Sequence, residues 1–465
     1  MKNLKFSILF ASIVGGAIYL SPIKKNLVQY LPNIFTRNQL RSLREFILPY
    51  KIIIEQAKDY ENINKEIIEH SNYLSELEIL KKISNTDIKT IKTTNNLPQT
   101  KFFDLNNITL EKHRLTSGFY SGISLNFPGS GYIDFYKDDM IIVSSKGVLA
   151  YSKKFPSNEV VFKQIKHNID EFKNLKQFKK SKTFSIKDLL IFKKSIYISY
   201  TDEISEDCWN TSVISGDIDY KKINFQKLFV SKKCIHSTKN PDNEFKIVQS
   251  GGRLIPFDND NIVLSVGDYR NRYLAQNIDS VNGKLIKINL NNKKHEIISM
   301  GHRNPQGLYL DKENNFLLET EHGPFGGDEI NLLKGIKTNE DNIYNFGWAI
   351  ASAGEHYGGK IKDNQKKYEK YPLHKSHSEF GFIEPLKSFV PSIGISEIVK
   401  IGKKNYVVSS LKDKSLYFFT LNDSKLIKNL DRIFIGERIR DLKLKNKRLH
   451  MFLEDTASIG ILNLN

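Results

Sequence analysis

Six short apolar runs, each introduced by a polar turn, recur at wide intervals along the chain. The runs are KDDMIIVSSKG, KKSIYISYTD, DNDNIVLSVGD, KENNFLLETEHG, KKNYVVSSLKD and NKRLHMFLED. From Ile141 to Leu449 the five intervals average about 62 residues, which leaves room in each repeat for four strands and their loops. A repeat of this size in a strand-rich chain is typical of propeller blades. The runs predict an all-β fold, a six-bladed β-propeller over residues 102–465, with a pair of β-sandwiches as the competing architecture.

A propeller fold restricts where chemistry is expected. The inner strands converge on a central channel, and the loops at one mouth bring residues that are distant in sequence around one pocket. Functional side chains are therefore expected just after the inner strands. Two further segments, GKLIKINL (283–290) and KSLYFFTLN (414–422), alternate as outer strands do.

The first residues have the pattern of an export signal. In MKNLKFSILFASIVGGAIYLSPIKK, Lys2 and Lys5 precede an uncharged stretch from Phe6 to Ile23. That stretch is also just long enough to cross a bilayer. We predict a signal peptide or membrane anchor over residues 1–23. Either reading makes the body periplasmic or extracellular, and an uncleaved anchor would tether it to the inner membrane.

Between this start and the strand-rich region lie two segments of different character. Residues 38–85 place apolar side chains at loosely helical spacing without a strict heptad, which predicts a helical spacer over 24–85. The stretch SNTDIKTIKTTNNLPQTK (84–101) is polar and turn-rich, and it predicts a linker over 86–101.

The charge of the chain does not indicate nucleic-acid binding. Lys and Arg number 70 against 52 Asp and Glu, for a formal net charge of +18. These basic residues are scattered, and no recognised nucleic-acid-binding motif accompanies them. We predict a solvated basic surface and no nucleic-acid partner.

Only two cysteines occur, Cys208 and Cys234. Export favours their pairing, so we predict a disulfide that closes the intervening loop. Two free buried thiols are the alternative, and two cysteines cannot provide a four-ligand zinc site by themselves.

One stretch, GHRNPQGLYLDKENNFLLETEHGPFGGDEINLL (301–333), is dense in polar chemistry. Arg303 and Asn304 stand before the rigid Pro305 and offer a cation and an amide from a fixed turn. Gly323 and Pro324 can expose backbone carbonyls, which are hard oxygen ligands suited to calcium. The alternative is that Gly and Pro only shape the turn while Arg303 pairs with carboxylates.

These motifs resemble those of the glucose/sorbosone dehydrogenase family. GHRNPQGL, TEHGPFGGDEIN and NFGW carry the resemblance, and SGGRL (250–254), LSVGD (264–268) and GKLIKI (283–288) match upstream in the same order. PSIGISEIV (391–399), SSLKDKSLY (409–417) and ERIRDL (437–442) match downstream. The similarity covers roughly residues 115–465. It implies a six-bladed propeller like the soluble aldose sugar dehydrogenases, which carry pyrroloquinoline quinone (PQQ) and Ca²⁺.

The resemblance also implies roles for individual residues. Arg303 and Asn304 would face the quinone carbonyls, and the carbonyl oxygens of Gly323 and Pro324 would hold the calcium. The cofactor's carboxylates and quinone oxygens would contact Lys412, Arg438 and Arg440. Independent chemistry agrees, since guanidinium groups complement carboxylates with paired hydrogen bonds. Arg438 and Arg440 are two residues apart, so a strand would point both to one face.

The chain departs from the family at the general base. In the family a histidine a few residues before the GR of the GGRL motif accepts the proton of the sugar C1 hydroxyl. Here Val248 or Gln249 occupies that position, and neither side chain can accept a proton near neutral pH. Asp268, which matches the carboxylate that orients the histidine, is retained. It could act directly as a weaker base, or His302 or His322 could take the role.

Two functions follow as hypotheses. The first is an exported quinoprotein oxidoreductase acting on CH–OH groups, which oxidises an aldose at C1 with PQQ and Ca²⁺ and passes electrons to a respiratory acceptor. The second is a catalytically impaired propeller that binds a glycan or a protein partner. The retained cationic residues favour the first hypothesis, and the absent histidine favours the second.

Overall fold

The computed structural model describes residues 87–97, 108–115, 130–156, 160–172, 185–335 and 343–464. The chain divides into two units, Met1–Leu74 and Ser75–Asn465, and every described residue belongs to the second. The predicted signal or anchor (1–23) and helical spacer (24–85) lie outside the described residues. Within the described ranges, none of the helices combines the length and the apolar character that a membrane crossing requires.

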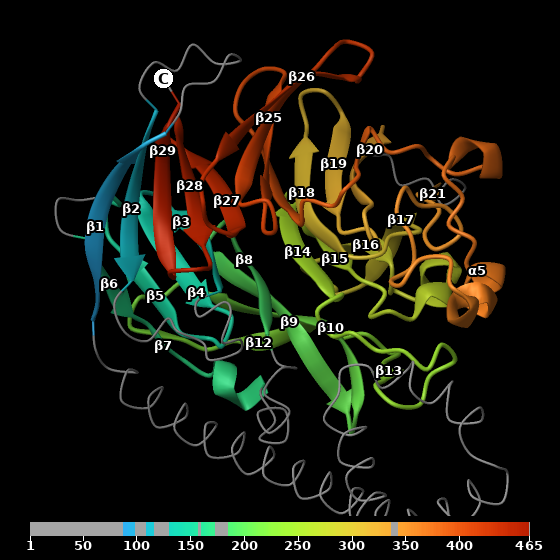
Figure 1. Ribbon diagram of the computed structural model, residues 1–465. Coiled ribbons are helices and arrows are strands. Elements are labelled where there is room, and N and C mark those ends of the chain that lie inside the picture. Colours follow the sequence, from blue (N-terminus) through green and yellow to red (C-terminus); the bar gives the residue numbers. More distant parts are fainter. Residues whose placement is uncertain are drawn as a thin grey trace, which may run out of the picture. The chain divides into compact units, whose positions relative to one another are not determined.

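Antiparallel sheets make up nearly all of the described structure (Figure 1). Three of them follow one another along the second half of the chain. The first contains β14 (Gly251–Pro256), β15 (Asn261–Val266), β16 (Lys284–Asn289) and β17 (His295–Met300), extended by the short parallel β21 (Tyr344–Asn345). The second contains β18 (Pro305–Asp311), β19 (Phe316–Glu321), β20 (Asp328–Lys334) and β22 (Lys387–Phe389). The third contains β23 (Ile395–Lys400), β24 (Asn405–Ser410), β25 (Ser415–Leu421) and β26 (Ile427–Phe434).

The remaining strands form three sheets: one similar to the three above, one large and one small. The similar sheet contains β8 (Ile186–Phe192), β9 (Ser195–Ser205), β10 (Cys208–Asp217) and β12 (Gln226–Phe229), with β13 (Ile235–His236) paired to β10. The large sheet has nine strands in the order β27 (Ile439–Lys445), β28 (Arg448–Leu453), β29 (Ser458–Asn463), β2 (Thr109–Leu115), β1 (Ile88–Asn96), β6 (Val161–Gln164), β5 (Leu149–Ser152), β4 (Asp139–Ser144) and β3 (Gly131–Tyr136). The small sheet pairs β7 (Lys166–His167) with β11 (Lys222–Ile223).

Helical structure among the described residues is confined to short segments. They are the 3₁₀ turns Ile169–Phe172, Arg272–Gln276, Lys362–Asn364 and Ser378–Phe380, and α5 (Gln365–Lys370). The prediction of an all-β fold is therefore confirmed.

The sheets are arranged around their first strands. These strands contact one another in the cyclic order β3, β8, β14, β18, β23, β27 and back to β3. Apolar clusters fill the spaces between neighbouring sheets; one joins Leu190 of β8 to Leu254 of β14 and Leu264 of β15. Because sheets pack on both faces, strands such as β15 and β24 are buried along nearly their whole length. This explains why the recurring runs are continuously apolar rather than alternating.

The six recurring runs are the second strands of these units, namely β4, β9, β15, β19, β24 and β28. Each pairs antiparallel with the first strand before it. In an antiparallel pair, the start of the first strand and the end of the second lie at the same edge. Residues before a first strand and after a second strand therefore meet at one mouth.

Within the predicted linker 86–101, the described residues 87–97 differ from the sequence prediction. Residues Ile88–Asn96 form strand β1, which pairs with both β2 and β6, instead of a linker. The alternating IKTIKTT pattern contains β-branched Ile and Thr, which favour strands. Most of β1 is exposed, so its polar composition reflects an outer position in the sheet.

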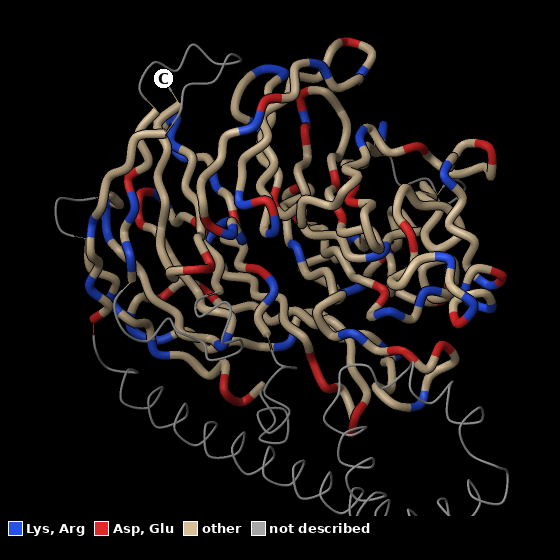
Figure 2. The backbone as a smooth tube through the Cα atoms, in the orientation of Figure 1, with Lys and Arg blue, Asp and Glu red and all other residues tan. Residues whose placement is uncertain are grey.

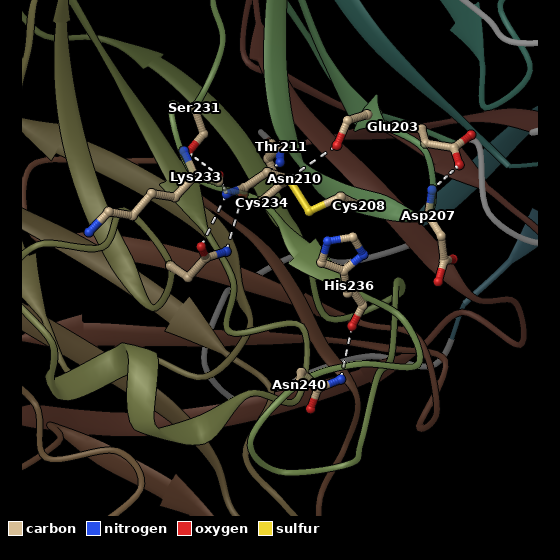
Figure 3. Close-up of a disulfide and its surroundings, with 12 residues drawn as sticks. Glu203, Asp207, Cys208, Asn210, Thr211, Ser231, Lys233, Cys234, His236 and Asn240 are labelled. Atoms are coloured by element: carbon tan, nitrogen blue, oxygen red, sulfur yellow. Dashed lines mark hydrogen bonds between the residues drawn. A yellow bond between two sulfur atoms is a disulfide. The ribbon is translucent and has the colours of Figure 1, made fainter.

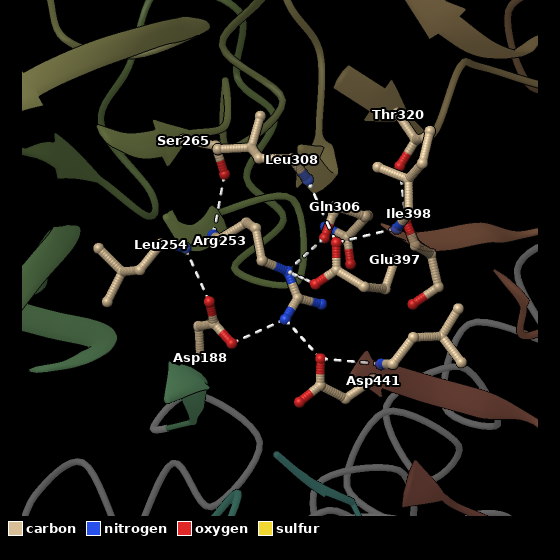
Figure 4. A network of polar contacts seen from close by, with 12 residues as sticks. Asp188, Arg253, Leu254, Ser265, Gln306, Leu308, Thr320, Glu397, Ile398 and Asp441 are labelled. Atoms are coloured by element: carbon tan, nitrogen blue, oxygen red, sulfur yellow. Dashed lines mark hydrogen bonds and ion pairs between the residues drawn. The ribbon is translucent and has the colours of Figure 1, made fainter. Parts of the chain in front are cut away.

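A buried ion cluster lies where the first strands converge (Figure 4). The Arg253 guanidinium pairs with Asp188 (Nη1–Oδ1, 2.7 Å), Asp441 (Nη1–Oδ1, 2.8 Å) and Glu397 (Nε–Oε2, 2.7 Å). None of the four side chains is more than 3% exposed. The cluster thus joins β14 to β8, β27 and β23.

The two cysteines form a disulfide at the edge of the β8–β12 sheet (Figure 3). Cys208 begins β10, and Cys234 immediately precedes β13, which pairs with β10. Asn210 Nδ2 also donates to the Lys233 carbonyl at 2.8 Å. The bond and these contacts fasten the loop after β12 to β10.

Among the described residues, Lys and Arg are distributed along the strands and loops, with Asp and Glu between them (Figure 2). The solvated basic surface and the lack of a nucleic-acid partner stay predictions.

The ion cluster allows a prediction about stability. Replacing Arg253 with Met keeps much of the side-chain volume but removes the guanidinium that pairs with all three buried carboxylates, leaving only the Lys443 ammonium nearby. We expect a loss of about 3–5 kcal/mol in the free energy of unfolding, measured by urea denaturation. Arg432→Met, which removes an exposed pair with Asp413, is the control and should cost less than about 1 kcal/mol. Equal small losses for the two variants would contradict the role given to Arg253.

Candidate active site

Arg303 is held in a fixed position at the start of β18. Its backbone N–H donates to Glu321 Oε2 (2.6 Å), and its Nη1 donates to the His322 carbonyl (2.7 Å). The guanidinium carbon lies 5.5 Å from the centre of the Trp348 ring, within the range of a cation–π contact. Only 4% of Arg303 is exposed. These contacts fix both its backbone and its guanidinium group.

Asn304 belongs to the same turn and ties it to two other sheets. Its Oδ1 accepts hydrogen bonds from the Gly251 backbone N–H (3.1 Å) and from Gln306 Nε2 (3.0 Å). Gln306 Oε1 in turn accepts from Arg440 Nη1 at 3.4 Å. A continuous set of contacts therefore connects the turn before β18 with the start of β14 and with β27.

The structure identifies the residue that occupies the expected histidine position. Gln249 is 7% exposed, whereas Val248 is 58% exposed and points to solvent. With its amide oriented so that both ends find partners, Gln249 donates to Asp268 Oδ1 (3.2 Å) and accepts from Arg303 Nη2 (2.8 Å). Gln249 thus sits between the predicted orienting carboxylate and the predicted cofactor-facing arginine. Val248 has no place in the site.

Asp268 lies beneath Gln249 and is completely buried. Its Oδ2 accepts from Trp348 Nε1 (2.7 Å), and its Oδ1 accepts from the Arg270 backbone N–H (2.8 Å). Burial raises the pKa of Asp268, although the nearby Arg303 opposes the shift. A buried carboxylate with both oxygens engaged orients its neighbours and has no open path to a substrate hydroxyl.

Neither nearby histidine is placed as an open substitute base. His302 is completely buried, and its Nε2 lies 2.8 Å from Ser299 Oγ. His322 is half-buried, and its Nε2 is shielded from solvent. Burial lowers the pKa of His322. The nearby Asp328 opposes this shift, whereas the cationic Arg303 and Arg440 act in the same direction as burial.

The loop between β19 and β20 brings two backbone carbonyls to the same mouth. Gly323 and Pro324 are both buried. A Cβ on Gly323 would come within 1.5 Å of the Gly327 carbonyl oxygen, so the tight loop requires glycine there. Among the described residues, neither the Gly323 nor the Pro324 carbonyl oxygen accepts a hydrogen bond. Gly323 lines a small pocket together with Arg303, Glu321, Glu329, Phe346, Trp348, Ala351 and Ser352.

Arg438 and Arg440 share one face at the start of β27, while Ile439 between them is completely buried. Both guanidinium groups pair with Glu454, which follows β28: Arg438 Nε at 2.9 Å and Arg440 Nε at 2.5 Å. Glu454 also accepts from Ser130 Oγ at 2.7 Å. This carboxylate orients the two arginines, and the sequence analysis missed it.

Lys412 follows β24 and is exposed. Its backbone N–H donates to the Ile393 carbonyl (3.0 Å), beside Gly394. Gly394 N–H in turn donates to Asp328 Oδ2 at 2.6 Å, which joins this turn to the start of β20. Among the described residues, Lys412 is connected to the site through these backbone hydrogen bonds.

Two side chains therefore matter more than the sequence suggested. Trp348, the tryptophan of the NFGW motif, donates to Asp268 and lies against Arg303. Glu454 gave no motif signal, although it stands after a second strand, where the strand pairing places site residues.

The Trp348–Asp268 contact yields a prediction. Trp348→Phe removes the indole donor and leaves Asp268 Oδ2 buried without it, so we expect about 1–3 kcal/mol less stability from this loss. The matched control is Trp209→Phe, because Trp209 is also buried but its Nε1 has no hydrogen-bond partner. Denaturant unfolding should show the larger loss for Trp348→Phe. The reverse order would mean that the contact contributes little.

Two curated proteins are similar to this chain in sequence. A curated relative, aldose sugar dehydrogenase YliI of Escherichia coli (strain K12), is 28% identical over 237 residues, which are 46% of this chain and 59% of the relative. Quinoprotein glucose dehydrogenase B of Acinetobacter calcoaceticus is 34% identical over 133 residues, 26% of this chain and 27% of the relative. The matched segments thus span less than two thirds of these relatives.

Solved structures show the same fold. The soluble aldose sugar dehydrogenase of Escherichia coli in its apo form superposes with a TM-score of 0.56 at 19% identity, covering 80% of this chain and 100% of that protein. The PQQ-bound aldose sugar dehydrogenase of Streptomyces coelicolor gives 0.53 at 14% identity, covering 80% and 98%. The glucose/sorbosone dehydrogenase family profile matches residues 191–462, more than half of the chain. The resemblance found in the sequence motifs is therefore confirmed, and this chain belongs to the glucose/sorbosone dehydrogenase family.

Proposed function

We propose that this chain binds PQQ and Ca²⁺ at the mouth formed by these loops and oxidises an aldose sugar at C1. The observation that carries the proposal is the gathering of Arg303, Asn304 and Arg440 with the Gly323 and Pro324 carbonyls at one edge of the sheets. When bound, the quinone would accept a hydride from the sugar. Family membership and the PQQ-bound neighbour support the cofactor assignment.

The residues present fit such a cofactor. PQQ is a planar tricarboxylate, and paired guanidinium hydrogen bonds suit carboxylates. Arg303, Lys412, Arg438 and Arg440 supply four cations, and two of them, Arg438 and Arg440, pair with the carboxylate of Glu454. The two carbonyl oxygens without hydrogen bonds are ligands of the kind that Ca²⁺ prefers. Arg303 would stabilise the negative charge that develops on a quinone oxygen.

Proton removal from the sugar is the weak point of the proposal. The Gln249 amide can orient a hydroxyl but cannot accept its proton near neutral pH. General-base help is typically worth about 10²–10⁴ in rate, so we expect slow turnover. The second candidate is a propeller that retains the scaffold but only binds a glycan or protein partner. Gln249, which cannot act as a base, and the buried Asp268 favour this candidate.

We further infer six propeller blades, one for each first strand in the cyclic order, with β2 completing the blade of β27, β28 and β29. We also propose a periplasmic or extracellular location, where Ca²⁺ is available. Residues 1–23 would serve as a signal peptide or inner-membrane anchor, and a respiratory carrier would accept the electrons. The disulfide supports an oxidising compartment.

The direct test uses the purified full chain with PQQ and Ca²⁺, following cofactor absorbance and dye reduction with a panel of aldoses. Saturable binding with turnover supports the dehydrogenase, and binding without turnover supports the impaired propeller. An absence of cofactor binding contradicts both the cofactor assignment and the proposed enzyme.

Arg438→Ala tests the cationic residues within that assay. Losing a carboxylate-binding guanidinium should weaken PQQ binding by about tenfold or more, equivalent to about 1.4 kcal/mol. Arg448→Ala is the charge-matched control. Arg448 is exposed and begins β28, at the opposite end of that strand from Glu454, so its loss should leave the PQQ affinity unchanged. A similar loss of PQQ affinity in both variants would mean that Arg438 acts only through the overall charge of the protein.

Gln249→His tests the missing base. A histidine at this position would have Asp268 within reach to orient it, so we expect turnover with aldose to rise by about 10²-fold or more. Val248→His is the control, because Val248 points to solvent and should give no gain. If the Gln249→His variant binds the cofactor but shows no gain in turnover, the site lacks more than a general base.

A further inference from the structure

A second group of chemically active side chains lies behind Arg303, and no step proposed above uses it. His302 precedes β18, and Glu319 and Glu321 lie on β19. His302 and Glu319 are completely buried, and Glu321 is 3% exposed. One possible ligand atom from each of the three lies within 4.8 Å of the other two.

Two buried atoms in this group lack hydrogen-bond partners among the described residues. They are His302 Nδ1 and Glu319 Oε1. The other ring nitrogen of His302 is engaged with Ser299 Oγ at 2.8 Å, which sets the orientation of the ring. Nδ1 is therefore aimed at the carboxylates, 3.8 Å from Glu319 Oε2 and 3.7 Å from Glu321 Oε1.

These separations do not suit hydrogen bonds but do suit shared coordination. An N–H···O bond rarely exceeds about 3.2 Å. Two ligand atoms bound at about 2.1 Å to one tetrahedral ion lie about 3.4 Å apart. The two His302–carboxylate separations, 3.7 and 3.8 Å, are close to that value, and all three ligand atoms lie within 4.8 Å of one another. An inward movement of the side chains would bring three ligands onto one ion.

The charge of the group also calls for a cation. Buried carboxylates side by side repel each other, and an unpaired buried charge is costly. Asn331 Nδ2 donates to Glu319 Oε2 (2.9 Å) and Glu321 Oε1 (3.2 Å), but an amide carries no compensating charge. Burial and the proximity of Glu321 raise the pKa of Glu319, as expected for a carboxyl without a cation beside it.

We propose that His302 Nδ1 and the carboxylates of Glu319 and Glu321 bind a divalent transition-metal ion, represented by Zn²⁺. An imidazole nitrogen among the ligands favours Zn²⁺ over Ca²⁺, which prefers oxygen ligands alone. This site uses other ligand atoms than the Gly323 and Pro324 carbonyls, and it does not depend on the proposed function.

The ion would act on the position of Arg303. Glu321 presents one carboxylate oxygen to His302 and the other, Oε2, to the Arg303 backbone N–H. Fixing Glu321 by coordination would therefore also fix the turn that carries Arg303. The site would be a structural metal centre supporting the mouth of the sheets.

The test measures metal content and does not depend on activity. The full chain is produced in zinc-supplemented medium, dialysed against excess Ca²⁺, and analysed for zinc by mass spectrometry. We expect stoichiometric zinc that calcium does not displace, and Co²⁺ in its place should give the visible absorption of a site with nitrogen and oxygen ligands. Stoichiometric binding should also raise the Tm.

Glu319→Gln keeps the shape of the side chain and removes one anionic ligand, so the affinity for Zn²⁺ should fall by at least about tenfold. Glu313→Gln, in the exposed turn before β19, is the control and should keep the metal. Should Glu319→Gln fail to fold, the zinc content and Co²⁺ spectrum of the unaltered chain decide the question. The proposal would be overturned if that chain held no stoichiometric Zn²⁺ or Co²⁺, or if a folded Glu319→Gln variant kept the same Zn²⁺ affinity. Bound protons would then neutralise the negative charge of Glu319 and Glu321.

Discussion

The Arg253 cluster is the contact on which the arrangement of the sheets depends. One guanidinium on β14 pairs with carboxylates on β8, β23 and β27. Two of those carboxylates reach further: Asp441 accepts from the Ile133 backbone N–H on β3 (2.9 Å), and Glu397 accepts from the Leu308 backbone N–H on β18 (3.2 Å). Each of the six first strands therefore contributes a group to one buried network. A buried charge needs every partner in place, so the network favours a single arrangement of the strands.

This convergence places the functional residues. First strands that meet at the centre start at one mouth, and antiparallel second strands return to it. Arg303, Gln249 and Arg440 stand at or near the starts of first strands, while His322, Lys412 and Glu454 follow second strands. Gln249 makes the hydrogen bonds of an oriented side chain to Asp268 and Arg303, yet it supplies no base.

The sequence predicted the strand content well, because apolar runs between polar turns leave local signals. It predicted less where the signal depends on distant partners. Strand β1 appeared to be a linker because its outer position permits polar residues. Val248 and Gln249 could not be separated by spacing, since only the fold shows which one faces Asp268. Glu454 orients two arginines from another strand, and no motif marks such a residue.

The central claim is that cationic side chains from separate sheets enclose a planar, anionic redox cofactor beside a divalent ion. A crystal structure of the full chain grown with PQQ and Ca²⁺ tests it most directly. The account predicts cofactor oxygens within hydrogen-bonding distance of Arg303, Lys412 and Arg440, with the ion on the Gly323 and Pro324 carbonyls. A cofactor bound elsewhere, or a mouth that stays empty at saturating PQQ, would contradict it.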